Sequence, residues 1–256
     1  MNPPRVVGVI PARYASQRLP AKPLLDLLGK TMVQRVYEQA KKAHRLNQVI
    51  VATDDERIAV AVRSFGGEVV LTSPEIKSGS DRVAAIAAQN AGDIFLNIQG
   101  DEPLIAPQMI DEAAEILIDE PTALVGTLAR KIESHDELVN PGIVKVVVDK
   151  NSYALYFSRS VIPFIRDEQE SSKWLAKRTF YKHIGLYVFR KEFLLGFARM
   201  PESSLEQSEK LEQLRILENG YKIKVGFTEH DSIPIDTQAD ANRVIAILKS
   251  QNNLNS

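Results

Sequence analysis

Short apolar runs alternate with amphipathic segments over the first half of the chain. The runs predicted as strands are residues 6–10, 48–52, 68–71, 93–99 and 123–130. Helices are predicted at residues 32–43 and 56–65, and a third is predicted to begin at residues 78–82. Strands that alternate with helices of about ten to fifteen residues are typical of βαβ units with right-handed crossovers. We therefore predict an α/β fold with a mainly parallel sheet.

The pattern changes after residue 143. Strands are predicted at residues 144–149, 153–158 and 183–189 without long helices between them, and Lys150-Asn151 favours a hairpin between the first two. These strands predict a β-rich insertion at about residues 140–200. No segment with the composition of a linker interrupts the chain, so a single domain over residues 1–256 is expected.

Two later segments carry distinct signals. The polar segment at residues 166–178 contains Trp174, the only tryptophan, and is interpreted as a mobile loop or as a contact with a partner. Ser203 and Glu206 have the spacing of a capping box, which predicts a helix that extends to Asn219.

The loop after the first predicted strand is cationic. The strand is expected to stop at Pro11, which cannot donate to a ladder, and Arg13, Ser16, Arg18 and Lys22 follow. Ligands commonly bind at such loops of open α/β sheets, and clustered cations suit an anion with several oxygens, such as a polyphosphate. Neither G-x-x-x-x-G-K-[ST] nor G-x-G-x-x-G is present here. A solvated basic loop is the alternative interpretation.

The segment at residues 78–82 is expected to begin a helix. The residues alone favour an ordinary capped helix, and the alternative is that its hydroxyls and backbone N–H groups form a site for an anion or a polar ring. Arg82 would lie in the first turn, where a cation opposes the helix dipole. We therefore expect Arg82 to have a role other than stabilising this helix.

The turn after the fourth predicted strand carries adjacent carboxylates. Gly100 permits a tight turn, and Asp101 and Glu102 follow at the sheet edge where the cationic loop is expected. Carboxylates that face bound phosphates repel them unless a cation lies between, and Mg²⁺ is often held by one or two carboxylates plus substrate phosphates. We predict a Mg²⁺ site, with a solvated acidic turn as the alternative.

Composition narrows the possible chemistry. The 256 residues are 44% hydrophobic and 25% charged, as in ordinary globular proteins, and the net charge of −1 gives no general affinity for nucleic acid or anionic membranes. The absence of cysteine excludes disulfides and thiolate chemistry, and the four histidines lack metal-ligand spacing. No signal peptide and no apolar run of about 18 residues is present, so we expect a cytoplasmic protein.

Characteristic motifs occur along nearly the whole chain, from about residue 6 to residue 248. They are IPARYASQRLPAKPL (10–24), VATDDERI (51–58), SGSDR (78–82), NIQGDEP (97–103), VKVVVD (144–149), ALYFSRSVIP (154–163), HIGLYVFRKEFL (183–194), LEQLRIL (211–217) and IDT (235–237). Together they resemble the 3-deoxy-manno-octulosonate cytidylyltransferase (CMP-KDO synthetase) family. Many sugar nucleotidyltransferases share the first motif, whereas QGDEP, ALYFSR and HIGLY in this order are specific.

This resemblance implies a reaction between CTP and 3-deoxy-manno-octulosonate (KDO) that yields CMP-KDO and pyrophosphate for lipopolysaccharide biosynthesis. It also implies a requirement for Mg²⁺ and a homodimer. The implied fold is a single Rossmann-like nucleotide-binding domain, typical of sugar nucleotidyltransferases. Helices cover both faces of its sheet, and a β-rich region contributes to dimerisation and sugar binding. Such a reaction depends on positioning and charge neutralisation, so no Ser-His-Asp triad is needed.

The resemblance also assigns roles to individual residues. Lys22 is implied as the cation on the attacked phosphate, with Arg13 and Asp101 as the other catalytic residues, and Asp101 and Asp236 as the metal ligands. The implied nucleotide-binding residues are Ala12, Arg13, Ser16, Arg18, Lys22, Ser78, Gly79, Ser80, Arg82 and Asp101. The implied sugar-acid-binding residues are Gln99, Arg159, His183, Tyr187, Glu212 and Gln213.

The positions of two sugar-site candidates, His183 and Tyr187, on one strand allow a second interpretation. Residues 183, 185 and 187 share one strand face, and Gly185 leaves room there for a ligand. The alternative is that at least one of His183 and Tyr187 is an ordinary core residue, and the room at Gly185 favours the ligand interpretation.

Three other functions are considered. A cytidylyltransferase for a related sugar acid, such as 8-amino-KDO or a sialic acid, would have the same nucleotide-binding half. A non-catalytic nucleotide sensor would need no Lys22, Asp101 and Asp236. A nicotinamide-dependent oxidoreductase is disfavoured, because the first loop lacks the glycine fingerprint and is cationic.

Overall fold

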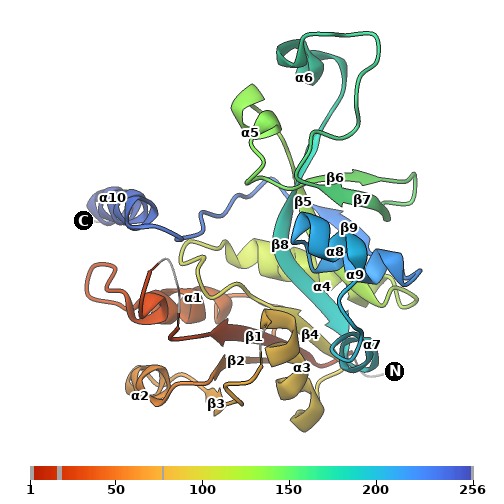
Figure 1. Cartoon of the computed structure of the whole chain (residues 1–256). Coiled ribbons are helices and arrows are strands. Elements are labelled where there is room, and N and C mark those ends of the chain that lie inside the picture. Colours follow the sequence, from red (N-terminus) through yellow and green to blue (C-terminus); the bar gives the residue numbers. More distant parts are fainter. Residues whose placement is uncertain (1–2, 16–18, 77, 255–256) are drawn as a thin grey trace.

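The first half of the chain forms a parallel sheet, as its apolar pattern predicts. The computed structural model describes residues 3–15, 19–76 and 78–254, without the side chains of residues 252–254. The parallel strands are β1 (Val6–Ala12), β2 (Gln48–Thr53), β3 (Val69–Leu71) and β4 (Ile94–Asn97), in the order β3-β2-β1-β4. The chain moves from β1 to β2 and β3 and then returns to place β4 on the other side of β1 (Figure 1). The switch point of the sheet therefore lies between β1 and β4.

The second half of the chain extends the same sheet. Its strands are β5 (Val125–Lys131), β6 (Lys145–Val148), β7 (Ala154–Ser158), β8 (Tyr181–Arg190) and β9 (Lys224–Phe227). Strand β8 runs antiparallel to both β4 and β5, and β9 runs parallel to β5. On the described path β3-β2-β1-β4-β8-β5-β9, only β8 is therefore reversed. The predicted mainly parallel sheet is confirmed, and so is the β6–β7 hairpin, which joins the sheet through β8.

The predicted end of the first strand at Pro11 is wrong. Strand β1 continues to Ala12, and Pro11 pairs with Ala52 of β2. Pairing with β4 ends at Val9 and Asn97, so Pro11 lies where one side of β1 no longer has a paired strand. A proline is tolerated at such a position, because it interrupts no ladder there.

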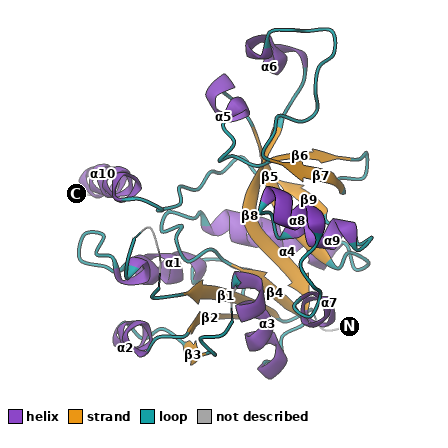
Figure 2. Cartoon of the chain, in the orientation of Figure 1, coloured by secondary structure: helices purple, strands orange, loops and turns teal. Residues whose placement is uncertain are grey.

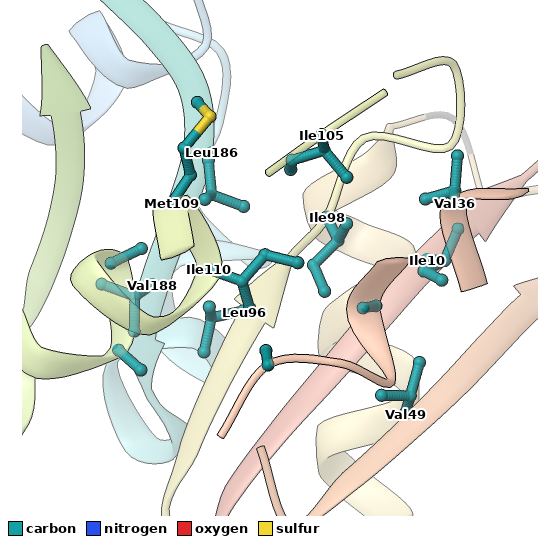
Figure 3. Close-up of a cluster of buried hydrophobic side chains, with 14 of the residues drawn as sticks. Ile10, Val36, Val49, Leu96, Ile98, Ile105, Met109, Ile110, Leu186 and Val188 are labelled. Atoms are coloured by element: carbon teal, nitrogen blue, oxygen red, sulfur yellow. The ribbon is translucent and has the colours of Figure 1, made fainter. Parts of the chain in front are cut away.

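Helices cover both faces of the sheet, as predicted (Figure 2). One face packs against α1 (Met32–Ala40), α2 (Glu56–Ser64) and α4 (Pro107–Asp119). The other packs against α3 (Gly79–Gln89), α7 (Lys191–Phe197) and α9 (Gln213–Glu218). Sequence reasoning missed α4, although its buried side chains have helical spacing. Figure 3 shows two of them, Met109 and Ile110, in the core with Leu96 and Ile98.

Helix ends follow the predicted caps at most positions. Thr31 accepts a hydrogen bond from the Gln34 backbone, and Gly66 has a φ of +77°, as expected for its place after α2. The capping box at Ser203 and Glu206 is present, but the single helix predicted after it is not. Lys210 takes a left-handed φ of 53° and separates α8 (Ser204–Glu209) from α9. The break directs the next residue, Leu211, into the core.

A small lobe carries the segment at residues 166–178 (Figure 1, top). It comprises α5 (His135–Val139), the 3-10 helix η2 (Ser171–Lys173) and α6 (Trp174–Lys177). Trp174 is buried there with Phe180 and Leu138, and its indole N–H donates to the Glu168 carbonyl at 2.8 Å. The segment is thus anchored on its own small core, which the prediction of a mobile loop did not anticipate.

The last helix returns the chain to the N-terminal half. Helix α10 (Gln238–Leu254) buries Ala241, Val244 and Leu248 against Leu27 and Met32. This contact brings the segment just before α10 close to the loop after β1. Within the described residues, no helix combines the length and apolar character needed to cross a membrane.

Candidate active site

A cavity of about 270 Å³ opens at the carboxyl ends of β1 and β4. It lies at the switch point of the sheet, where ligands of open α/β folds usually bind. Gly100 permits the close approach of the two strand ends, because a Cβ there would lie 2.5 Å from the Pro11 carbonyl oxygen. The lining residues are Pro11, Ala12, Arg13, Ala15, Lys22, Pro23, Met32, Gly79, Gln99, Gly100 and Asp101. The first loop and the QGDEP turn therefore share one cavity, as the sequence predicts.

Lys22 lies between two carboxylates at this cavity. Its Nζ is 2.7 Å from Asp101 Oδ2 and 2.9 Å from Asp236 Oδ1. Burial by itself would lower the pKa of Lys22, but the charges and hydrogen bonds of Asp101 and Asp236 outweigh it and raise the pKa. The Ile235 N–H donates to the Asp101 carbonyl at 2.9 Å, which holds Asp236 beside the turn after β4. Fully charged Lys22 thus joins three segments that are distant in sequence.

The carboxylates of Asp101 and Asp236 fit Mg²⁺ only if oxygens of a bound ligand complete its coordination shell. Asp101 and Asp236 converge on the Lys22 ammonium, and the described part of the chain has no cluster of three or more acidic, histidine or cysteine side chains suited to a metal. Mg²⁺ is commonly held by one or two carboxylates with substrate phosphates completing its shell. The two aspartates therefore suit a cation that binds with a phosphate-bearing ligand.

Buried contacts explain why Arg82, a cation, lies in the first turn of a helix. Its side chain is fully buried in α3, donates to Asp54 Oδ2 at 2.9 Å and also contacts the Thr72 hydroxyl. Burial lowers the pKa of Arg82, against the opposing charge of Asp54. Arg13 lies 3.6 Å from the same carboxylate oxygen. Asp54 thus links α3 to the cationic loop, a role that sequence reasoning did not assign, although its position after β2 is a signal.

The start of α3 combines a cap with a cavity wall. Ser78 caps the helix by accepting a hydrogen bond from the Asp81 backbone at 3.0 Å, and Gly79 lines the cavity. Ser80 is buried and donates to Glu212 Oε2 at 2.7 Å. Ser16 and Arg18, which the sequence also assigns to nucleotide binding, lie outside the described residues.

Buried polar atoms without hydrogen-bond partners gather around Ser80. Asn97 Nδ2 lies 3.5 Å from the Ser80 hydroxyl, and burial together with the nearby charge of Glu212 raises the pKa of Tyr187. Within the described residues, the side-chain atoms that lack partners include Asn97 Oδ1, Tyr187 OH, Glu212 Oε1 and Gln213 Nε2. Each such atom costs about 1–3 kcal/mol if it stays unpaired.

Asn97 was not singled out from the sequence. The signal in the sequence was a polar residue at the end of an apolar strand. In the structure, Asn97 is in direct register with Tyr187 of β8. This register brings the start of α3 at Ser80 and strand β8 to one place.

His183 is half-buried and lines a second cavity, of about 280 Å³, beside β8. Its Nε2 lies 2.9 Å from the Thr127 hydroxyl, and its ring contacts Phe157 edge-on, with the ring centroids 5.0 Å apart. Burial lowers the pKa of His183 to about 3, so the ring is neutral near pH 7. Gln99 donates to the Gly185 carbonyl at 2.8 Å, which places it beside the same strand.

The structure does not bring Arg159 into the cavity between β1 and β4. Its Nε donates to the Glu209 carbonyl at 2.7 Å and its guanidinium also donates to the Pro141 carbonyl at 3.1 Å. Its backbone N–H donates to the Glu209 carboxylate at 3.0 Å. Arg159 therefore holds the end of α8 against β7 in this conformation.

Asp101 and Glu102 face different cavities, so the structure does not support their expected joint contact with one cation. Glu102 is 9% exposed and lines a neighbouring cavity of about 280 Å³. Burial and the charge of Asp101 raise its pKa from 4.5 to about 7. Its Oε2 has no hydrogen-bond partner among the described residues.

Glu102→Gln is expected to change how stability depends on pH. Because the folded-state pKa of Glu102 is raised from 4.5 to about 7, its contribution to stability is present below pH 4.5 and is lost as the pH rises through 7. Glutamine does not titrate, so the variant should gain about 3 kcal/mol over wild type between pH 4.5 and 7. Urea unfolding of the metal-free proteins at several pH values measures this, with exposed Glu75→Gln as control. Parallel curves for wild type and variant would contradict it.

The chain is similar to known proteins over nearly its whole length. Residues 7–223 match the family model described as cytidylyltransferase. The 3-deoxy-manno-octulosonate cytidylyltransferase of Geotalea uraniireducens is 51% identical over 249 residues, which cover 96% of this chain and 99% of that protein. A solved CMP:2-keto-3-deoxy-manno-octonic acid synthetase complexed with CTP is 41% identical, with a TM-score of 0.90 over 96% of this chain and 99% of that one.

A more distant structure shares the fold alone. The 4-diphosphocytidyl-2C-methyl-D-erythritol synthase of Anaerococcus prevotii is 12% identical, with a TM-score of 0.63 over 97% of this chain and 100% of that one. The sheet, its switch-point cavity and the match over residues 7–223 define a nucleotidyltransferase of the cytidylyltransferase class. Within this class, the chain belongs to the 3-deoxy-manno-octulosonate cytidylyltransferase family. The resemblance inferred from the motifs is confirmed.

Proposed function

We propose that this protein transfers CMP from CTP to KDO, giving CMP-KDO and pyrophosphate for lipopolysaccharide biosynthesis. The observation that carries the proposal is the position of Lys22 between Asp101 and Asp236, at a cavity on the switch point of the sheet. Membership of the family supports KDO as the acceptor, and the related structure complexed with CTP supports the nucleotide.

The proposed reaction is an in-line displacement at phosphorus. The anomeric hydroxyl oxygen of KDO forms a bond to the α-phosphorus of CTP, the bond from that phosphorus to the β-phosphate bridge oxygen breaks, and pyrophosphate leaves with the electron pair. The hydroxyl proton passes to solvent. Lys22, with Arg13, neutralises the negative charge that builds up on the phosphate oxygens. Mg²⁺ held by Asp101 and Asp236 would supply further positive charge when bound.

The proposed nucleotide site surrounds the loop after β1 and the start of α3. Ala12, Arg13, Gly79 and Asp101 line the same cavity as Lys22, which supports their assignment. Ser78, Ser80 and Arg82 are proposed to shape the cytosine side through the ordered start of α3. Ser16 and Arg18 keep their proposed roles as phosphate ligands.

The proposed sugar site lies next to this cavity. The unpaired buried atoms of Tyr187, Glu212 and Gln213 support their assignment to the hydroxyl groups of the sugar acid. Gln99, His183 and Arg159 are proposed to complete the site. Neutral His183 would act as a hydrogen-bonding group rather than as a cation. Arg159 would have to exchange carbonyl partners for the KDO carboxylate.

Several wider features also belong to the proposal. The chain is proposed to act as one domain over residues 1–256, in the cytoplasm and as a homodimer. Its β-rich region at about residues 140–200 would contribute to dimerisation and sugar binding. Phe164 and Leu155, 71% and 62% exposed, lie in this region and support an interface there.

A panel of acceptors tests the proposed function. Purified protein with CTP and Mg²⁺ is expected to release pyrophosphate with KDO, and more slowly with 8-amino-KDO or a sialic acid. No pyrophosphate with KDO would overturn the proposal, and faster release with another sugar acid would favour that substrate. Binding of CTP without turnover on any acceptor would instead favour a nucleotide sensor.

A further inference from the structure

The segment that carries Asp236 has little regular structure to hold it in place. Between the end of β9 at Phe227 and the start of α10 at Gln238, the chain forms neither helix nor strand. Asp236 must nevertheless stay beside Asp101 and Lys22 for the proposed function. The connections of this segment to the rest of the protein therefore matter for the site.

One connection lies directly beside Asp236. The Ile235 N–H donates to the Asp101 carbonyl at 2.9 Å, and the Ile235 side chain is buried with Leu27 and Met32. This connection fixes the C-terminal end of the segment at the active site.

The second connection is an ion pair at the other end of the segment. The Lys182 Nζ lies 2.7 Å from Asp231 Oδ2 and 2.8 Å from Glu137 Oε1, and the Lys182 side chain is only 10% exposed. Arg130 also approaches Asp231, at 3.3 Å. Lys182 is on β8 and Arg130 is on β5, so both cations are part of the sheet. Asp231 is thereby attached to a rigid surface.

A cavity lies between the two connections. Its volume is about 280 Å³, and Glu102, Lys182, Asp231, Ser232 and Pro234 are among its lining residues. The segment from Asp231 to Pro234 therefore borders a cavity on one side, while Ile233 packs against the cluster that contains Leu27 and Met32. Apolar packing thus holds Ile233 and Ile235, and the ion pair holds Asp231.

We propose that Lys182 is a positioning residue that holds the metal carboxylate Asp236 in place through Asp231. This inference rests on the proposed function of Asp236. Residues that orient metal ligands from outside the coordination shell typically change metal affinity about 10- to 100-fold when altered. Loss of the Lys182–Asp231 pair should let the segment move and weaken metal binding without removing any ligand.

Glu137 provides a matched control, because it shares the Lys182 ammonium but lies on α5, outside the segment. Asp231→Asn and Lys182→Met are expected to weaken Mn²⁺ binding to the CTP-bound protein about tenfold, measured by electron paramagnetic resonance without KDO. Exchange of the Ile235 amide hydrogen in the metal-free protein should accelerate about tenfold. Glu137→Gln and Lys182→Arg are expected to stay within about threefold of wild type in both measurements.

The outcomes separate this inference from the proposed function. Equal effects of Asp231→Asn and Glu137→Gln, or lower melting temperatures with unchanged Mn²⁺ affinity and Ile235 exchange, would overturn the positioning role. Asp236→Asn is measured alongside. If it binds Mn²⁺ as wild type does, the metal role of Asp236 fails, whereas the Ile235 exchange rates still show whether Lys182 holds the segment.

Discussion

Lys22→Met is expected to lower kcat for pyrophosphate release about 10²- to 10³-fold, because a preorganised cation at the reacting phosphate is lost. Methionine keeps most of the side-chain volume and removes only the charge that lies between Asp101 and Asp236. If Lys22 stabilises mainly the transition state, the KM for CTP should change much less than kcat. Steady-state kinetics at saturating Mg²⁺ measures both constants.

The control for this variant is Lys30→Met. Lys30, which precedes α1, pairs with Glu38 in the last turn of that helix at 2.7 Å, and the Lys30 side chain is 44% exposed. The control should retain wild-type kinetics, since exposed ion pairs contribute little. A Lys22 variant within about threefold of wild type in kcat would refute the catalytic role, provided that melting curves show both proteins folded.

Asp101→Asn is expected to abolish Mg²⁺-dependent turnover while CTP binding falls much less. The asparagine amide is close in size to the carboxylate but lacks the negative charge that holds a hard cation. A loss of about 10²- to 10³-fold in kcat is expected, because the developing charge on the phosphate then lacks its metal. Isothermal titration with CTP and a Mg²⁺ titration of turnover separate the two effects.

Two further variants are compared with Asp101→Asn. Asp236→Asn should behave in the same way, since both carboxylates contact Lys22 within 3 Å. Asp119→Asn, an exposed position at the end of α4, serves as the control and should be silent. Near-normal turnover of Asp101→Asn at low Mg²⁺ would exclude the metal role.

The elements of the first half were predictable because their signals are local. Each strand is a short apolar run that ends at a turn, and Thr31 and Gly66 mark helix ends through hydrogen bonds within a few residues. The same local approach failed after Ser203. The capping box is real, but the break at Lys210 accompanies the burial of Leu211 in the core, and that burial is a tertiary effect.

The site was only partly predictable. Lys22 and Asp101 follow strands that carry them to one sheet edge, so the topology rule placed them together. The rule did not distinguish Asp101 from Glu102, because neighbouring residues of a turn can face opposite ways, and here they line different cavities. It also offered no partner for Arg82, since Asp54 is 28 residues away in the chain.

By itself, the sequence determined the apolar runs that form the parallel sheet, the cationic loop after the first strand, and the motifs that identify the family. The tertiary structure decided which charges meet. Asp236 reaches Lys22 because α10 buries its apolar face against Leu27 and Met32, and Asp231 is attached to β8 through Lys182. Such contacts depend on packing between segments some 200 residues apart, as in the 214-residue separation of Lys22 and Asp236. No local pattern encodes a meeting of that kind, because the free energy that drives it comes from burying surfaces contributed by both ends of the chain.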